Sequence, residues 1–187
     1  MADGTAADYA LLDRHEQAHA AGLADRILVA LEALSDSLGG YRVTRLEHSL
    51  QTATRARRDG ADVDWVVAAL VHDLGDDLAP FNHGAFAASV LEPYVREEVT
   101  WVVRHHGVFQ AWYYAHHLGG DRHARDSYAG HEWAPLCVDF CERWDQRSFD
   151  PDSPTDDLAS FGAEVREVFG RTAWAPEVVA PGTRGGP

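Results

Sequence analysis

The sequence predicts an all-α domain, and three observations support that fold class. Apolar residues recur at helical spacing over much of the chain, as at Ile27, Leu31 and Leu34. Capping residues and glycine stops, such as Gly39-Gly40, separate these stretches. No stretch alternates apolar and polar side chains in the way that a half-buried strand does. We therefore expect a single helical bundle of about seven to nine helices.

The first three expected helices lie before residue 60. Residues 8–21 are rich in alanine and contain no turn former, and residues 27–38 carry the apolar repeat described above. Thr44 can cap the third helix, because Glu47 stands three residues later and completes a capping box. That helix should end at Asp59-Gly60, since glycine is a common stop after a helix.

An apolar helix is expected next, over residues 65–73, with Asp64 as its N-cap. Pro80 marks the loop after it, and Pro93 breaks the helix that follows the loop. The remaining expected helices share apolar residues at helical spacing and cover residues 83–91, 95–106, 133–146 and 158–169.

Length and charge narrow the classes of function. The chain has 187 residues, enough for one domain with a sizeable core, which we expect over residues 1–175. Residues 176–187 are rich in proline and glycine, and we expect them to form a disordered tail. The formal net charge of −14 argues against nucleic acids and anionic membranes as partners.

Targeting and redox features indicate a cytoplasmic protein. The N-terminus lacks a basic start followed by an apolar run, so we expect no signal peptide. No stretch approaches transmembrane length. The two cysteines, Cys137 and Cys141, are too few for a disulfide scaffold and fit a reducing compartment. The sequence leaves the oligomeric state open.

Histidines and carboxylates follow one another in an order that predicts a metal centre. His72-Asp73 closes the apolar helix, and these neighbours can serve one site if the helix end points at the metal. A lone histidine is usually a surface or hydrogen-bonded residue, so the prediction depends on the whole series. Imidazoles and carboxylates are the ligands of zinc, iron, manganese and two-metal sites. The other candidates are His48, His83, His105, His106 and Asp145.

The candidate ligands stand in five short segments: Leu46–Ala53, Ala68–Gly75, His83–Leu91, Val103–His106 and Arg143–Gln146. Each of them resembles a segment of the HD-domain superfamily of metalloproteins. Within it, the pattern is most similar to the mixed-valent di-iron oxygenase branch. That branch includes 2-amino-1-hydroxyethylphosphonate dioxygenase and, more distantly, myo-inositol oxygenase. The resemblance covers about Tyr41 to Phe169 and implies an all-α HD domain with the metal site among its central helices.

The resemblance implies a ligand set for two iron ions in a mixed-valent Fe(II)/Fe(III) pair. It favours His106 over His105 by the one-residue register of the family's segment. It also implies that Asp73 bridges the two irons and takes part in catalysis. His48 and Asp145 would bind one iron, His83 and His106 would bind the other, and His72 would complete the set. The implied ligands are His48, His72, Asp73, His83, His106 and Asp145.

The resemblance further implies an oxygenase that uses O2 on a small organic substrate, which chelates one iron through a hydroxyl group. The expected substrate region departs from the phosphonate oxygenase pattern. Asp76 follows Gly75 where that enzyme has a histidine, and Gln110 stands where it has a substrate-binding lysine. We therefore expect a hydroxylated or amino-substituted substrate rather than a phosphonate. The expected substrate contacts are Gln110, Tyr41 and Arg125.

Residues outside the ligand set are expected to orient the imidazoles. The candidates are Glu47, Asp76 and His105. Glu47 is also a candidate catalytic residue, and its alternative role is that of a helix cap.

Two other functions stay open on the sequence alone. The same ligands could hold Mn or Mg in a metal-dependent phosphohydrolase that acts on a nucleotide or a small phosphate monoester. Arg104, Arg122 and Arg125 could then clamp the phosphate. Such a hydrolase should work without O2, whereas an oxygenase should not. The third function is that of a protein that binds metal or a ligand without turnover.

Overall fold

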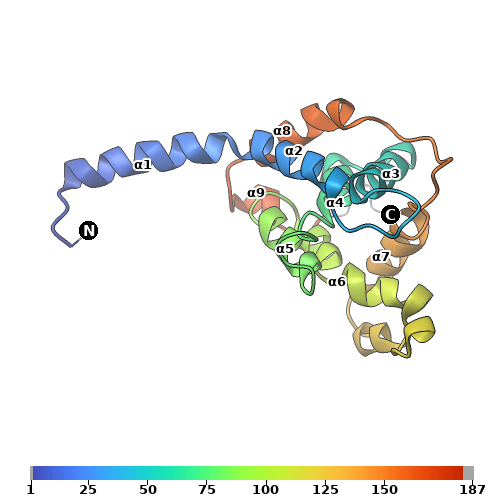
Figure 1. The fold of residues 1–187 in the computed structure, drawn as a ribbon. Helices are drawn as coiled ribbons and strands as arrows, with labels where there is room; N and C mark the ends of the chain where they lie inside the picture. The colour runs from blue at the N-terminus through green and yellow to red at the C-terminus, as the bar shows by residue number, and fades with distance from the viewer. Residues whose placement is uncertain (1, 183–187) are drawn as a thin grey trace.

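The computed structural model describes residues 2–182, which form helices and loops without a β-strand (Figure 1). The prediction of an all-α fold is confirmed. The α-helices are α1 (Ala6–Ala21), α2 (Leu23–Ala33), α3 (Arg45–Arg58), α4 (Val63–Val71), α5 (His83–Leu91), α6 (Glu97–Tyr114), α7 (Ala134–Asp139), α8 (Gly162–Phe169) and α9 (Pro176–Val179). Shorter helical turns are η1 (Leu34–Asp36), η2 (Ala115–Leu118), η3 (Ala124–Tyr128), η4 (Phe140–Asp145) and η5 (Leu158–Phe161).

Helix α4 forms the centre of the bundle. Its residues from Trp65 to Val71 are at most 3% exposed, as expected for a helix that is apolar on all sides. Helices α3, α6 and α8 pack around it, and α5 packs on α6. Trp65 meets Trp144 edge to face, with ring centroids 6.3 Å apart, which joins α4 to η4 in one core.

Helix α3 begins at the predicted capping box and turns a polar face inward. The Thr44 hydroxyl accepts a hydrogen bond from the Glu47 amide at 3.0 Å, and the Glu47 carboxylate accepts one from the Thr44 amide at 2.7 Å. The Gln51 side chain donates to the Asp150 carbonyl at 2.8 Å. This buried polar face therefore packs against the segment that follows η4, close to the last predicted ligand.

Two predicted boundaries differ from the structure. Asp62, rather than Asp64, caps α4, because its side chain accepts hydrogen bonds from the amides of residues 64 and 65. Asp64 is instead buried in ion pairs with Arg96 and Arg171. Helix α6 continues to Tyr114, eight residues beyond the predicted end, and Phe109 in this extension is 1% exposed.

The helix predicted over residues 133–146 is divided into α7 and the π-helix η4. The Gln146 amide donates to the Cys141 carbonyl at 2.8 Å, a bond that spans five residues rather than four. A π-turn is often found at functional sites because the extra residue per turn redirects the side chains after it. Here the π-helix ends at Asp145, a predicted ligand.

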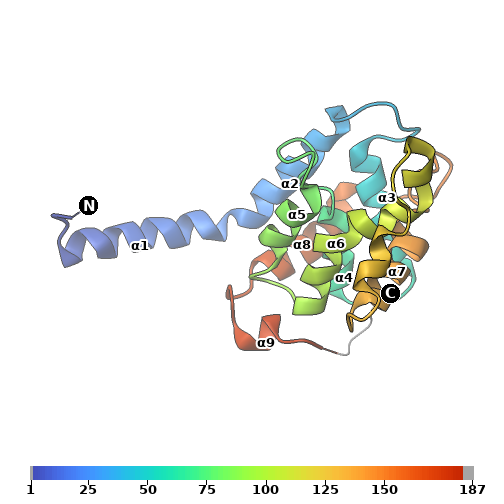
Figure 2. The ribbon, with the colours of Figure 1, turned by 90° about the horizontal axis from the view of Figure 1, so that it is seen from below.

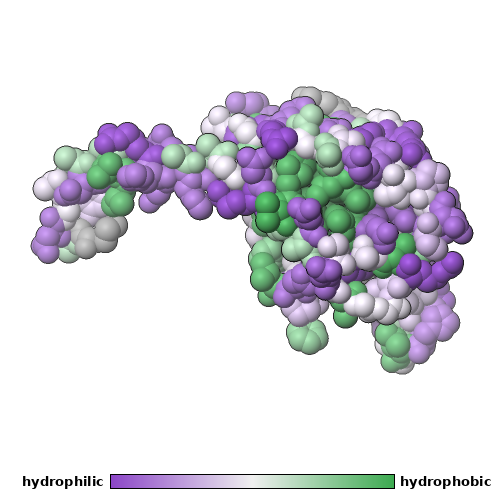
Figure 3. All heavy atoms as spheres, turned by 45° about the horizontal axis from the view of Figure 1, so that its top comes forward, coloured by the Kyte–Doolittle hydropathy of each residue, from purple (hydrophilic) through white to green (hydrophobic). Residues whose placement is uncertain are grey.

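The ends of the chain differ from the bundle. Helix α1 projects from the body as an arm in two perpendicular views, and none of its residues is buried (Figures 1 and 2). Its surface is mostly polar, whereas the body shows a hydrophobic patch near the base of the arm (Figure 3). The expected disordered tail contains α9 over residues 176–179, where Pro176 is preorganised to start a helix. Residues 183–187 lie outside the described part of the chain. Across residues 2–182, no helix combines the length and apolar composition needed to cross a lipid bilayer.

Candidate metal centre

The structure brings all six predicted ligands together around one point. His48 comes from α3, His72 and Asp73 from the turn after α4, and His83 from the first residue of α5. His106 lies in α6, and Asp145 ends η4. Five of these side chains are buried, and His83 is the partly exposed one. Elements from five parts of the sequence thus converge on one cluster.

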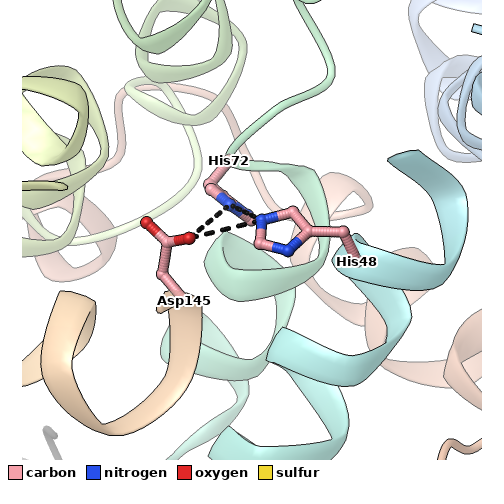
Figure 4. Close-up of side chains that lie close together, drawn as sticks. All are labelled: His48, His72 and Asp145. Carbon is pink, nitrogen blue, oxygen red and sulfur yellow. Dashed lines mark hydrogen bonds and ion pairs between the residues drawn. The ribbon is translucent and has the colours of Figure 1, made fainter. Parts of the chain in front are cut away.

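One half of the cluster joins His48, His72 and Asp145 (Figure 4). His48 Nε2 lies 3.3 Å from Asp145 Oδ1 and 3.1 Å from His72 Nε2. Asp73 Oδ2 closes this group, at 3.3 Å from His48 Nε2 and 3.2 Å from His72 Nε2. We call this group of four donors the inner position. His72 thus lies with His48 and Asp145.

The other half joins His83 and His106 through the second oxygen of the same carboxylate. Asp73 Oδ1 lies 3.4 Å from His83 Nε2 and 3.2 Å from His106 Nε2. The two imidazole nitrogens are 3.3 Å apart. We call this group of three donors the outer position. Asp73 presents one oxygen to each position, as a carboxylate that bridges two cations would.

Backbone carbonyls fix three of the four imidazole rings. The Nδ1 atoms of His48, His72 and His106 lie 2.7–2.8 Å from the carbonyl oxygens of Ser148, Ala69 and Val103, respectively. A carbonyl only accepts, so each Nδ1 carries the hydrogen and each Nε2 directs a lone pair into the cluster.

Facing lone pairs require something positive between them. His48 Nε2 and His72 Nε2 lie 3.1 Å apart, a distance at which two lone pairs repel unless a proton or a cation intervenes. Asp145 Oδ2 is buried and has no hydrogen-bond partner. A buried carboxylate oxygen without a partner is unfavourable unless it binds a cation. The donor set therefore fits a pair of metal ions.

When no metal ion is bound, protons on the side chains take the place of the positive charge. Burial acts to lower the pKa of His48, but the facing carboxylates of Asp145 and Asp73 outweigh it and raise this pKa to about 9. Burial acts to raise the pKa of Asp145, and the facing imidazoles of His48 and His72 lower it overall. For His83, burial lowers the pKa.

Metal binding is therefore expected to release protons. A His48 with a pKa of about 9 is protonated at pH 7, so a metal ion must displace that proton from Nε2. The apparent metal affinity should rise with pH up to about 9 and fall as pH decreases. Titration calorimetry in two buffers with different heats of ionisation measures the release. A binding heat that is the same in both buffers at pH 7 would contradict this expectation.

Gly75 lets α5 approach the turn that carries His72 and Asp73. A Cβ atom at Gly75 would lie 2.9 Å from the Cα and the carbonyl oxygen of His83 and from Cβ of Phe86. Those distances are too short for any other residue without a backbone shift. A glycine two residues after Asp73 is thus required sterically, because only glycine lets His83 come close enough to join the cluster.

Arg45 is a site residue that the sequence reasoning missed. Its buried guanidinium contacts Asp73 Oδ2 through Nη2 and Asp76 Oδ2 through Nε. Arg45 lies three residues before His48 on α3, and residues three apart share a helix face. That spacing is the signal that would have placed Arg45 beside the cluster.

A cavity of about 600 Å³ opens onto the outer position. Of the six ligands, Asp73, His83, His106 and Asp145 line it, whereas His48 and His72 lie behind them. The two inner histidines are thus shielded, and all three donors of the outer position face the space where a small molecule can bind. Other residues of the cavity wall are Tyr41, Arg42, Gln110, Tyr114, Gln146 and Phe149.

Two of the predicted substrate contacts lie in this wall. The Gln110 amide nitrogen lies 3.3 Å from Asp145 Oδ1 and 3.1 Å from Gln146 Oε1, while its Oε1 is buried without a partner. Tyr41 stacks on Phe149 with centroids 5.4 Å apart, and Phe149 stacks on His48 at 4.2 Å. Phe149, which the sequence reasoning did not identify, is thus the part of the cavity wall that covers His48.

The structure places Glu47 and Arg125 away from the six clustered side chains. The Glu47 carboxylate is exposed and caps α3, which is the alternative role expected from the sequence. Arg125 does not line the cavity, because its guanidinium lies over the Trp112 ring at 3.9 Å from the centroid. Arg122 covers the same ring at 4.3 Å.

Two further expected contributors also lie elsewhere. Arg104 lies 3.5 Å from Glu92, outside the cavity wall, so none of the three arginines expected to clamp a phosphate lines it. His105 lies 2.8 Å through Nδ1 from the Trp101 carbonyl and stacks against the Trp101 ring, away from the cluster. The register prediction of His106 rather than His105 matches this placement. Asp76, in contrast, lies beside His83, with 3.5 Å between its Oδ1 and His83 Nδ1.

Comparisons with known proteins agree with this architecture. The HD domain family model matches residues 45–145, a range that includes all six clustered side chains. A protein of Leisingera caerulea, named [1-hydroxy-2-(trimethylamino)ethyl]phosphonate dioxygenase (glycine-betaine-forming), is 36% identical over 78 residues. The match covers 36% of this chain and 40% of that relative, so it spans less than half the length of either protein.

Proposed function

The chain belongs to the HD domain family, and we propose that it is an oxygenase that uses O2 and two iron ions to oxidise or cleave a small organic substrate. The observation that carries this proposal is the asymmetry of the cluster. Two positions share Asp73. All three donors of the outer position line the cavity, whereas His48 and His72 of the inner position do not. Its donors are two histidines and one carboxylate, the set that leaves coordination positions open in non-haem iron oxygenases.

Iron bound at the two positions would supply the one-electron chemistry that O2 activation needs. The residues of the chain have separate tasks around it. His48, His72 and Asp145 would hold the inner ion, and of these three only Asp145 lines the cavity. His83 and His106 would hold the outer ion and leave its remaining positions to substrate and O2. Phe149, stacked on His48, covers one face of that imidazole.

The cavity wall indicates what the substrate offers. Gln110 lines the cavity beside Asp145, and its neutral amide suits a hydroxyl or an amino group of the substrate. Tyr41 and Tyr114 give the wall two aromatic faces. These features support a small hydroxylated or amino-substituted substrate bound between the outer position and Gln110.

One further observation supports an oxygenase over a phosphohydrolase, because the relative from Leisingera caerulea is named as a dioxygenase. The three arginines expected to clamp a phosphate lie outside the cavity wall, although Arg42 and Arg45 line it. We do not extend the relative's phosphonate substrate to this chain, because a neutral amide stands at Gln110 where the resembled enzyme has a lysine.

Oxygen uptake tests the proposal. Iron-loaded protein is mixed with a panel of small amino alcohols and hydroxy acids in an oxygen electrode, in parallel with anaerobic assays of phosphate release from phosphate monoesters. We expect substrate-dependent O2 uptake, and Gln110→Ala should raise KM roughly tenfold, the effect of about one lost hydrogen bond. Turnover of a phosphate monoester with Mn or Mg in the absence of O2, with no O2 uptake on any substrate, would favour the phosphohydrolase.

A further inference from the structure

His83 is held in place differently from the other three histidines of the cluster. Their Nδ1 atoms meet backbone carbonyls at 2.7–2.8 Å, which the helices fix. His83 Nδ1 instead faces a side chain, the Asp76 carboxylate, at 3.5 Å. The His83 side chain is also 28% exposed, whereas the other three are at most 3% exposed. The orientation of this ring therefore depends on how Asp76 is held.

Arg45 holds Asp76. Its Nε donates to Asp76 Oδ2, and its Nη2 donates to Asp73 Oδ2, so one planar guanidinium joins the two carboxylates. The Arg45 side chain is 8% exposed and that of Asp76 is 10% exposed, which limits competition from water. The contacts form a continuous series from Asp73 through Arg45 and Asp76 to His83.

The position of the His83 backbone is fixed, but the rotation of its imidazole ring is not, and Asp76 can control that rotation. Gly75 already brings the backbone of His83 against the turn after α4. What remains is rotation of the ring, which decides whether Nε2 points at Asp73 Oδ1, 3.4 Å away. A carboxylate that accepts a hydrogen bond from Nδ1 fixes this rotation and the tautomer together.

We propose that Arg45 and Asp76 form a positioning pair that aims His83 and thereby controls whether the outer position retains its metal ion. This inference rests on the two-metal centre of the proposed function. The inner position does not need Asp76, because carbonyls orient His48 and His72, and Asp145 does not contact the pair. Loss of Asp76 should therefore empty the outer position and leave the inner one filled.

Asp76→Asn tests the role of the positioning pair, because asparagine has nearly the same shape as aspartate. A carboxylate can accept from Arg45 Nε and His83 Nδ1 at once, whereas an amide has one accepting oxygen and turns an NH2 group toward one of these two donors. We expect the affinity for the second metal ion to fall roughly 10–100-fold, as when other partners of metal-bound histidines are removed. Affinity for the first ion should stay at the wild-type value.

The measurement is metal content per chain during titration with Fe(II) under anaerobic conditions, with electron paramagnetic resonance after partial oxidation. Asp77→Asn is the matched control, because Asp77 is the next residue, is exposed and bonds to Ser37 instead of the cluster. His83→Ala is the reference for a lost outer position. Asp76→Asn should resemble His83→Ala in both readouts, and Asp77→Asn should resemble the wild type.

Arg45→Lys provides a second variant if Asp76→Asn does not fold. A lysine keeps the charge but lacks the planar fork that reaches both carboxylates, so it should release Asp76 and lower the affinity for the outer ion. Because Arg45 also contacts Asp73 Oδ2, this variant can weaken the inner position as well. The pair is refuted if either folded variant binds both ions with wild-type affinity, or if Asp76→Asn loses both ions together. A wild-type protein that binds only one ion would overturn the two-metal centre itself. This result would count against the proposed function, whereas the variants test the positioning pair.

Discussion

Asp73→Asn is expected to abolish metal binding at both positions and to reduce turnover on the order of 10³-fold or more. The reason is the geometry of one carboxylate: Oδ2 faces His48 and His72, and Oδ1 faces His83 and His106. An amide presents one oxygen and one NH2 group, so it cannot serve a cation on each side.

The effect of Asp73→Asn is measured as metal content after gel filtration, together with the rate of O2 uptake. Asp77→Asn again serves as the control, since it removes a carboxylate four residues away that lies on the surface. The variant should remain folded, because near-isosteric Asn preserves the packing around the turn. Retention of a full metal complement by Asp73→Asn would contradict the bridging role.

Trp144→Ala is expected to destabilise the fold by about 3–5 kcal/mol, the range for removing a large aromatic side chain from a core. Trp144 is fully buried, meets Trp65 and Phe140 edge to face, and donates a hydrogen bond to Asp59 at 2.8 Å. It also immediately precedes Asp145. The cavity left by the indole would therefore loosen the π-helix that places Asp145 at the inner position.

Trp174→Ala is the matched control, because it removes the same side chain from a site that is 59% exposed. Its effect on the free energy of unfolding should stay within about 1 kcal/mol. Denaturant titrations of both variants give the comparison. Equal losses in the free energy of unfolding at the two positions would show that the buried contacts of Trp144 contribute no more stability than an exposed tryptophan does.

Much of the fold follows from local patterns in the sequence. The capping box of Thr44 and Glu47 and the apolar run from Trp65 to Val71 placed α3 and α4, because capping and burial are set within a few residues. The π-helix could not be predicted, since one extra residue per turn scarcely alters the apolar pattern. The end of α6 was missed because Gly107 and the histidines before it resemble a helix stop.

The candidate site was also predicted only in part, because some of its contacts depend on residues that are far apart in the sequence. The order of histidines and carboxylates indicated the six clustered side chains, and the resemblance supplied the register that separates His106 from His105. Arg125 was misplaced because only the fold shows that Trp112 binds its guanidinium. Phe149 was missed for a similar reason, since its stacking on His48 joins residues 101 positions apart, from 48 to 149.

We propose a two-metal centre bridged by Asp73, and it can be tested by counting metals in protein purified without O2 and recording low-temperature paramagnetic resonance after partial oxidation. About two iron ions per chain with a coupled S = 1/2 signal are expected, because one carboxylate would join an Fe(II) and an Fe(III) ion. A single metal ion per chain, or two ions of Mn or Mg with no coupled signal, would contradict the di-iron oxygenase.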